Sequence, residues 1–517
     1  MNTHEGKNTL QSIELLEARI TTMVMLCLCF AASVFIHIAL AGITSAADVT
    51  NKKDTLTITY PRSDALFPRD IVAPTLRWKD TSGANEWHIS IRFKGIKETM
   101  EAEVRETNWR PSAEQWDKIK QLSLENETVI TVSGIIQDGS RKILSHEGIQ
   151  IKTSSDPVSF PIFFREVPLP TSEALANPLL TRWRLGYVSS NEPPRVVLEG
   201  MKICANCHAV TPDGKMLGMD VDVDRDKGAY IVTEIEKDTV LTRDKVMTWS
   251  DFRRLDYIKS LGLFSQISPD GRYLISTVKD SPTVLLRFPD LNYSQLFFPV
   301  KGILVVYDLQ TKQFFPLPGA DDPQYVQTNA VWSPDGKWIV FARAKTLSTV
   351  GNTKGFVDRT ESFRYDLYRI PFNGGKGGKA EAIQGASNNG RSNYFPKFTP
   401  DSKWLIYTQS DSFMIIQPDA ELHIIPAEGG VDRRMTCNTF GKMNSWHSLS
   451  PSGRWMVFSS KANGPYTQLW LTHIDKNGND TPPILLEGFT LQDRAANIPE
   501  FLNISQEKMQ KIVNRLD

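Results

Sequence analysis

Five consecutive residues, Cys204-Ala205-Asn206-Cys207-His208, have the types and the spacing for covalent cofactor chemistry. In a Cys-x-x-Cys-His run the two thiols can form thioethers with the vinyl groups of a porphyrin, and the adjacent imidazole can bind its iron. The motif predicts one haem c, held by Cys204 and Cys207, with His208 as proximal ligand. The alternatives are a zinc half-site and a redox dithiol. Zinc needs a second ligand pair, whereas outside the apolar N-terminal segment the only other cysteine is Cys437.

The chain from residue 204 onward repeats a short turn pattern. A Ser or Thr is followed by Pro-Asp-Gly or a close variant, then by Lys or Arg and an apolar strand; the copies start at Thr211, Ser268, Ser333, Thr399 and Ser450. Pro fixes φ, Asp accepts bonds from nearby amides and Gly tolerates a positive φ, so each copy predicts a turn. Steps of 51 to 66 residues are typical of the four-stranded blades of a β-propeller.

These turns, together with hairpins that end in Glu-Gly-Gly such as 422–430, resemble the repeats of TolB-type propellers. The likeness covers roughly residues 205–485. It implies a ring of five or six blades, to which strands from 156–203 would contribute. The likeness implies no activity, because propellers host many unrelated functions. The haem motif in the first repeat departs from TolB itself, and resembles bacterial proteins that join such a motif to a propeller.

The repeats also suggest a second iron ligand. His208 lies three residues before its turn, and His447 lies three residues before the last turn. The intervening repeats have other residues at this position, namely Ser265, Ala330 and Pro396. Because the first and last blades of a closed ring can be neighbours, we expect His447 to be the distal ligand. Met443 is the alternative distal ligand, and an open sixth position is the third option.

An acidic run follows the first turn, with carboxylates at Asp220, Asp222, Asp224 and Asp226. The alternation is that of a calcium loop, but Arg225 and Ile231 stand where such a loop has its Gly and its bidentate Glu. The apolar residues between the carboxylates favour a strand with one acidic face. Calcium is therefore only the weaker alternative here.

Residues 1–47 predict a cytoplasmic tail and a transmembrane anchor or signal segment. The stretch from Met23 to Ala41 is apolar apart from Ser33 and His37, and is long enough to span a bilayer. Small residues at 45–47 also offer a cleavage site. Together with the haem motif, this segment predicts a protein on the periplasmic side of a bacterial inner membrane, either anchored there or secreted.

The rest of the 517 residues predicts an all-β chain. Short β-branched and aromatic segments over 55–155 indicate a β-sandwich of fibronectin or immunoglobulin pattern. The propeller is expected over 204–500 and a tail over 501–517. Apart from the leader, helical periodicity is convincing only at 113–121 and 505–516. Lys plus Arg and Asp plus Glu balance at 59 each, so no nucleic-acid partner is expected.

The haem motif is the only strong chemical centre in the sequence. No Gly-x-Ser-x-Gly elbow occurs, and the residues after 485 are too few for a hydrolase domain. We expect an electron carrier with a periplasmic redox partner, since one haem without a second cofactor favours electron transfer. The alternatives are a TolB-like scaffold or sensor with a structural haem, and a haem-enzyme subunit with an open iron site, similar in architecture to propeller subunits of nitrogen-cycle complexes.

Overall fold

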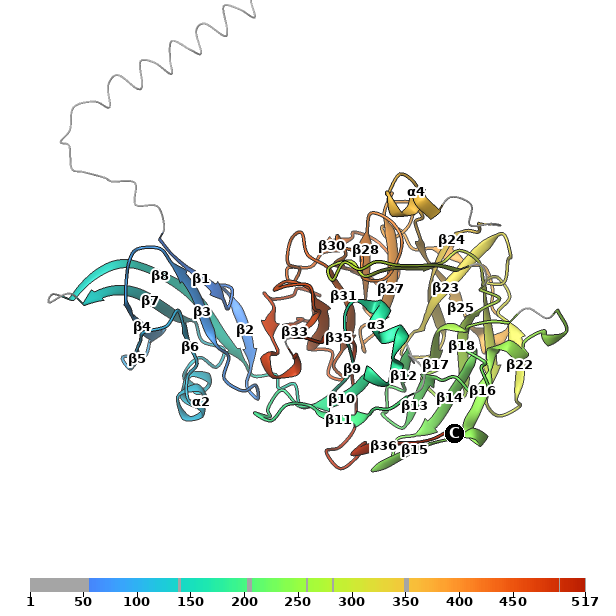
Figure 1. Ribbon diagram of the computed structural model, residues 1–517, viewed down its shortest axis with the longest axis horizontal. Coiled ribbons are helices and arrows are strands. Elements are labelled where there is room, and N and C mark those ends of the chain that lie inside the picture. Colours follow the sequence, from blue (N-terminus) through green and yellow to red (C-terminus); the bar gives the residue numbers. More distant parts are fainter. Residues whose placement is uncertain are drawn as a thin grey trace, which may run out of the picture. The chain divides into compact units, whose positions relative to one another are not determined.

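The computed structural model describes residues 55–137, 141–201, 207–256, 259–280, 283–347, 353–491 and 493–516. The chain divides into the units Met1–Thr55 and Leu56–Asp517, and every element below belongs to the second. The predicted anchor or signal segment, Met23–Ala41, lies outside the described residues, as does Cys204. Within the ranges described, no helix has the length and apolar character needed to cross a membrane. The described structure consists mostly of strands, as predicted (Figure 1).

The first part of the second unit consists of two sheets around one apolar core. One sheet has the order β1 (Leu56–Tyr60), β3 (Leu76–Asp80) and β6 (Asn108–Trp109). The other has the order β2 (Ala65–Pro68), β8 (Arg141–Ser154), β7 (Thr128–Gln137), β4 (Glu86–Phe93) and β5 (Thr99–Val104). Alternate residues of β4, from Trp87 to Phe93, are buried. The predicted helix is confirmed as α2 (Ala113–Leu122), which begins at a capping box formed by Ser112 and Gln115.

Six further four-stranded sheets in the described residues form the blades of a propeller. Blade 1 combines β35 (Ala495–Phe501) with β9 (Ile162–Val167), β10 (Arg182–Gly186) and β11 (Arg195–Leu198). Blade 2 is β12 (His208–Val210), β13 (Met216–Asp220), β14 (Ala229–Glu234) and β16 (Val246–Thr248). Blade 3 is β17 (Leu263–Ile267), β18 (Tyr273–Val278), β21 (Ile303–Asp308) and β22 (Gln313–Pro316).

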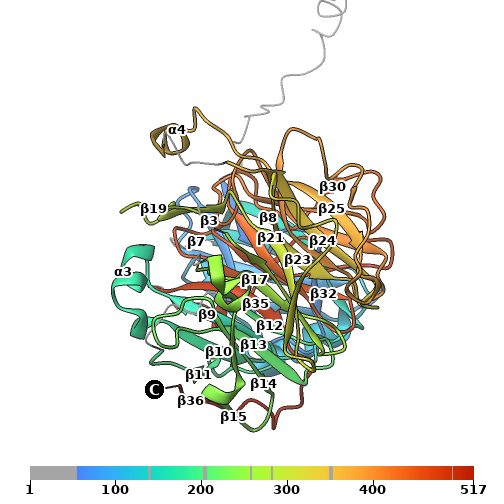
Figure 2. The ribbon, with the colours of Figure 1, turned by 90° about the vertical axis from the view of Figure 1, so that its right-hand side faces the viewer.

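The remaining blades follow in chain order. Blade 4 is β23 (Tyr325–Trp332), β24 (Trp338–Lys345), β25 (Asp366–Pro371) and β26 (Glu381–Ala382). Blade 5 is β27 (Ser392–Phe398), β28 (Trp404–Ser410), β29 (Glu421–Pro426) and β30 (Arg433–Arg434). Blade 6 is β31 (Asn444–Leu449), β32 (Trp455–Ser460), β33 (Gln468–His473) and β34 (Ile484–Leu485). The first strand named for each blade is its inner strand, and inner strands of successive blades contact one another from β12 round to β35. Figure 2 shows β12, β17 and β35 grouped near the middle of the ring.

The ring closes by pairing strands from opposite ends of the domain. β35 runs antiparallel to β9, with Ala495 opposite Val167 and Phe501 opposite Ile162. The segment 156–203 thus supplies three strands of blade 1, and the C-terminal region supplies the inner one. This blade lies between the two repeats that carry His208 and His447, so those repeats are not adjacent, contrary to our expectation.

The predicted turns are fixed by side chains within six residues of one another. In blade 4, Ser333 Oγ donates to the Asp335 carboxylate at 2.6 Å, and the same carboxylate accepts the Lys337 N–H at 3.1 Å. The Trp338 N–H donates to Ser333 Oγ at 2.9 Å, which starts β24. Gly336 has φ +70°, a value that costs a glycine little. The local contacts explain why the Ser-Pro-Asp-Gly pattern identifies a turn.

The expected helix over 505–516 is wrong. Residues Lys511–Arg515 form strand β36, which pairs in parallel with β15 (Asp238–Thr242). Met509, Ile512 and Leu516 are buried in the apolar core that blades 1 and 2 share. Their spacing is also that of one helix face, so the sequence pattern could not exclude a helix. The segment forms a strand because it pairs with β15 and buries its apolar side chains against blades 1 and 2.

Candidate functional site

A cavity of about 70 Å³ lies at the centre of the ring. Every inner strand, or the residue just before it, contributes to its wall; among the lining residues are Cys207, Phe264, Asn329, Phe395, Trp446 and Ile498. The last five of these have positive φ values of 44–59°, and each lies at a register shift of its strand. Such a bulge redirects a side chain. Cys207 stands at the same position relative to the turn in blade 2, so the haem motif ends within this ring of residues.

His208 is the first residue of β12 and is 2% exposed. Its ring meets the Phe163 ring edge-on, with centroids 4.7 Å apart. Burial, followed by the nearby charges of Lys397 and Arg165, lowers the pKa of His208 to about 3, against a smaller opposing effect of the Ile498 carbonyl. Within the described structure neither ring nitrogen makes a well-formed hydrogen bond, and the Ile498 carbonyl can only accept a hydrogen bond from the ring. The imidazole is therefore neutral at physiological pH and keeps a lone pair that no protein group uses.

Cys207 is held through its backbone by Asp220 at the end of β13. The Cys207 N–H donates to the Asp220 carboxylate at 3.0 Å, and the Asp220 N–H donates to the Cys207 carbonyl at 3.1 Å. Burial raises the pKa of the Cys207 thiol well above its usual value, and it raises the pKa of Asp220 to about 7. The Cys207 thiol is therefore protonated at physiological pH.

His447 lies on β31 and lines the same cavity as His208, at 2% exposure. Its Nε2 lies 3.1 Å from the Ile406 carbonyl of the neighbouring blade, whereas Nδ1 has no partner among the described residues. Burial and the Lys397 charge lower the pKa of His447 to about 3. Iron binding through Nε2 would replace the bond to Ile406, while Nδ1 is free of such competition.

Met443, the alternative distal residue, is buried just before β31 and is not among the residues that line the cavity. It belongs to the large apolar cluster between blades 3 and 5. Of the two distal candidates, the structure therefore places only His447 on the cavity wall.

A half-buried ion pair that the sequence did not indicate also lines the cavity. Lys397 Nζ lies 2.7 Å from a Glu500 carboxylate oxygen, and Ser448 Oγ donates to the other oxygen at 2.7 Å. These side chains come from β27, β31 and β35. Lys397 stands two residues before its turn, where repeat alignment could have marked it. Glu500 belongs to a strand without the turn pattern, so no repeat signal places it.

Three of the four carboxylates considered for calcium have other partners. Asp224 pairs with Arg243 at 3.0 Å, and Asp226 accepts hydrogen bonds from Thr248 and Ser250. Asp220 binds the backbone of the haem motif, as described above. Across the part of the chain that the structure describes, no group of three or more His, Cys, Asp or Glu side chains is placed to hold a metal ion.

The donors at the cavity fit a covalently held haem in part. A cysteine thiol for the thioether bond and a neutral imidazole with a free lone pair for the iron are groups that such a cofactor uses. The volume fits less well, because pockets for ligands of this size measure about 300–1,000 Å³. The cavity alone is therefore too small to enclose a porphyrin.

No protein-family model matches the chain, and no curated protein matches it. Among solved structures it is similar to TolB from Acinetobacter baumannii, at 15% identity and a TM-score of 0.42, over 73% of this chain and 79% of that one. It is also similar to a periplasmic gluconolactonase from Pseudomonas aeruginosa, at 12% and 0.36, over 64% and 84%. A third neighbour is hydrazine synthase from Kuenenia stuttgartiensis, at 17% and 0.33, over 57% and 71%. Likeness at this level transfers no activity, and the six sheets themselves establish the propeller.

Proposed function

We propose that this protein is a mono-haem c-type cytochrome on a propeller scaffold, acting in electron transfer on the periplasmic side of a bacterial inner membrane. The observation that supports it best is His208. A buried imidazole without a well-formed hydrogen bond stands directly after a cysteine whose surroundings keep the thiol protonated. Both belong to a Cys-x-x-Cys-His run.

Each group of this chain would have a defined part. Cys204 and Cys207 hold the porphyrin, and His208 binds its iron. A bound haem supplies one-electron chemistry. Asp220 fixes the backbone of Cys207, so that the thiol and the adjacent imidazole keep their mutual orientation. The aromatic side chains around the cavity exclude water, and the low pKa of His208 keeps its lone pair free of a proton.

His447 is our preferred distal ligand, since it is the second histidine of the cavity wall. Met443 and an open sixth position are the alternatives. Bis-histidine ligation gives a lower potential than His/Met ligation does. A periplasmic redox protein is the proposed partner, and Met23–Ala41 the proposed membrane anchor unless it is cleaved as a signal.

Covalent haem attachment tests the proposal directly. After expression with a haem-attachment system, the full chain is run on denaturing gels and stained for haem peroxidase activity. The wild type should keep its stain, and the Cys204→Ala, Cys207→Ala double variant should lose it. The Cys437→Ala variant is the matched control, because the Cys437 thiol is buried between blades 5 and 6 and does not line the cavity. An unstained wild type, or a stained double variant, would overturn the proposal.

A scaffold or sensor with a structural haem is the second candidate. It is favoured by the small volume of the cavity, which leaves little space for a substrate. The electron paramagnetic resonance spectrum of the ferric protein distinguishes the electron carrier and the scaffold with a structural haem from a haem enzyme. Low-spin iron indicates two protein ligands, and high-spin iron an open site.

A further inference from the structure

A hairpin inserted into blade 3 extends beyond its own blade. Between β18 and β21 the chain forms β19 (Thr283–Arg287) and β20 (Gln295–Pro299), which pair only with each other in the described structure. We call residues 283–299 the strap. An isolated two-stranded hairpin is marginally stable, so the position of the strap depends on what its tip and its inner side contact.

The tip of the strap is bound by the opposite side of the ring. Ser294 Oγ lies 2.7 Å from Thr171 Oγ1 at the start of α3 (Thr171–Ala176), in blade 1. The buried Lys461 of blade 6 donates to the carbonyls of Leu291 and Asn292, at 3.2 Å and 2.7 Å. Blades 3 and 6 are opposite in a ring of six. A hairpin that begins in one of these blades and contacts the other must therefore pass across one end of the ring.

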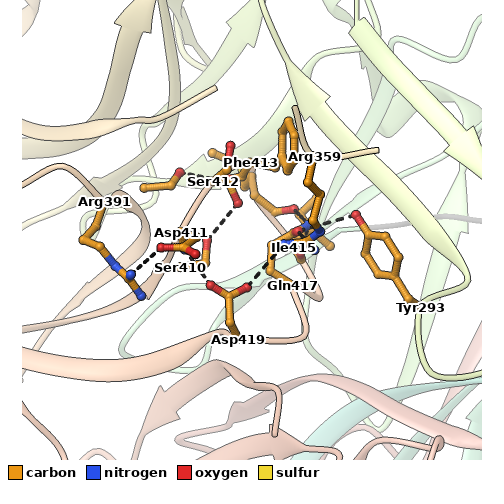
Figure 3. Close-up of polar contacts among 12 residues, drawn as sticks. Tyr293, Arg359, Arg391, Ser410, Asp411, Ser412, Phe413, Ile415, Gln417 and Asp419 are labelled. Carbon is orange, nitrogen blue, oxygen red and sulfur yellow. Dashed lines mark hydrogen bonds and ion pairs between the residues drawn. The ribbon is translucent and has the colours of Figure 1, made fainter. Parts of the chain in front are cut away.

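A third contact fixes the strap from blades 4 and 5. Figure 3 shows Tyr293 facing Arg359 and Gln417, which come from the insertions that follow β24 and β28. Arg359 donates to the Gln417 side-chain oxygen at 3.2 Å, and its guanidinium lies 5.5 Å from the centre of the Tyr293 ring. The Tyr293 hydroxyl lies 3.5 Å from the same Gln417 oxygen. These tip contacts are polar or cation–π, whereas Leu296 and Phe298 of β20 are fully buried in the apolar cluster below.

Side chains on both faces of the strap contact the surroundings of the haem-attachment cavity, whose described lining contains no strap residue. Val284, Leu296 and Phe298 belong to the apolar cluster against which Cys207 packs. Phe297 meets the ring of Phe264, a cavity residue, edge-on at 6.3 Å. The strap follows the second strand of its blade, so it emerges on the face where inner strands begin. Cys207 directly precedes an inner strand and therefore lies on that same face.

We propose that the strap is a lid that controls access to Cys207. The contacts of the strap with blades 1, 4, 5 and 6 show that it is closed in this structure. That this closure matters for the cofactor rests on the proposed haem site.

A reversible lock tests the lid. Thr171→Cys combined with Ser294→Cys in the full chain places two thiols where hydroxyls now lie 2.7 Å apart, within reach of a disulfide after a small adjustment. The haem-free protein is treated with iodoacetamide, and alkylation of Cys207 is followed by peptide mass spectrometry. The oxidised double variant should be alkylated at Cys207 at least tenfold more slowly than the same protein after reduction. Each single variant, treated identically, should show no such difference.

Opening the lid supplies the second arm. Lys461→Ala removes the donor to both tip carbonyls and should speed alkylation of Cys207 severalfold under native conditions, well below the melting temperature of the variant. Equal rates in the oxidised and reduced lock would overturn the lid, as would a Lys461→Ala rate equal to wild type. Because the probe is applied to haem-free protein, this result is independent of haem staining. A failed lid and a failed haem assignment are thus distinguishable.

Discussion

Asp280 should make the stability of the propeller depend on pH in a direction opposite to that of an ordinary carboxylate. It follows β18, is 2% exposed, and accepts hydrogen bonds from Ser260 Oγ and the Leu261 N–H at 3.3 Å and 3.2 Å. Burial raises the pKa of Asp280 from 3.8 to about 6. Between these values the folded protein holds a proton that the unfolded chain has lost. The free energy of unfolding therefore falls as pH rises through this interval.

The size of this effect follows from the pKa difference. One pKa unit corresponds to about 1.4 kcal/mol, so a shift of about two units is worth up to about 3 kcal/mol. Asp280→Asn keeps the shape of the side chain and removes the titration. Relative to this variant, the wild type should lose up to about 3 kcal/mol between pH 3.5 and pH 7, and the loss should be complete about one unit above the folded pKa of about 6.

Urea unfolding of the full chain, followed by tryptophan fluorescence at several pH values, measures this difference. Other carboxylates titrate over the same range, but they cancel when the two proteins are subtracted. Asp238→Asn, at an exposed position of β15, is the control and should follow the wild type. If the curves for wild type and Asp280→Asn run parallel from pH 3.5 to pH 7, burial of an uncharged Asp280 is refuted.

Two further predictions concern ring closure and the iron. Gly214→Ala should lower the melting temperature more than Gly336→Ala: both glycines have φ near +70°, but a Cβ at Gly214 would lie 2.1 Å from the Asn503 carbonyl, whereas nothing lies within 4 Å at Gly336. Equal losses would contradict the clash. His447→Ala should retain covalent haem and give high-spin ferric iron, and His447→Met should raise the reduction potential, because thioether ligation favours ferrous iron. His423→Ala should do neither, and an unchanged low-spin spectrum in His447→Ala would direct attention to Met443.

The sequence predicted the propeller because its turns are local. Ser333, Asp335 and Trp338 fix one turn within six residues, and such a pattern can be read without knowledge of the fold. The pairing of β35 with β9 joins residues more than 300 positions apart and has no local signal. For the same reason the pairing of β36 with β15 could not be foreseen, and the spacing of its apolar residues suggested a helix instead.

The candidate site was predictable to a similar extent. Alignment of the repeats placed His447 at a position equivalent to that of His208, and both line the cavity. It could not show that His447 bonds to the Ile406 carbonyl, since Ile406 belongs to another blade. Alignment of the repeats also could not show the strap. Lys461 and Thr171 contact its tip only because their blades lie across the ring from the blade that carries the strap.

The closure of blade 1 has a consequence for the order in which this protein matures. Strand β9, whose residues Ile162–Val167 are all buried in the finished ring, is synthesised more than 300 residues before its partner β35. Until β35 is made, β9 has an unpaired edge, and such edges promote association between chains. An exported chain would therefore need protection by a chaperone until its C-terminal residues have crossed the membrane. A nascent chain stalled before residue 495 should aggregate, although five of its blades are complete in sequence.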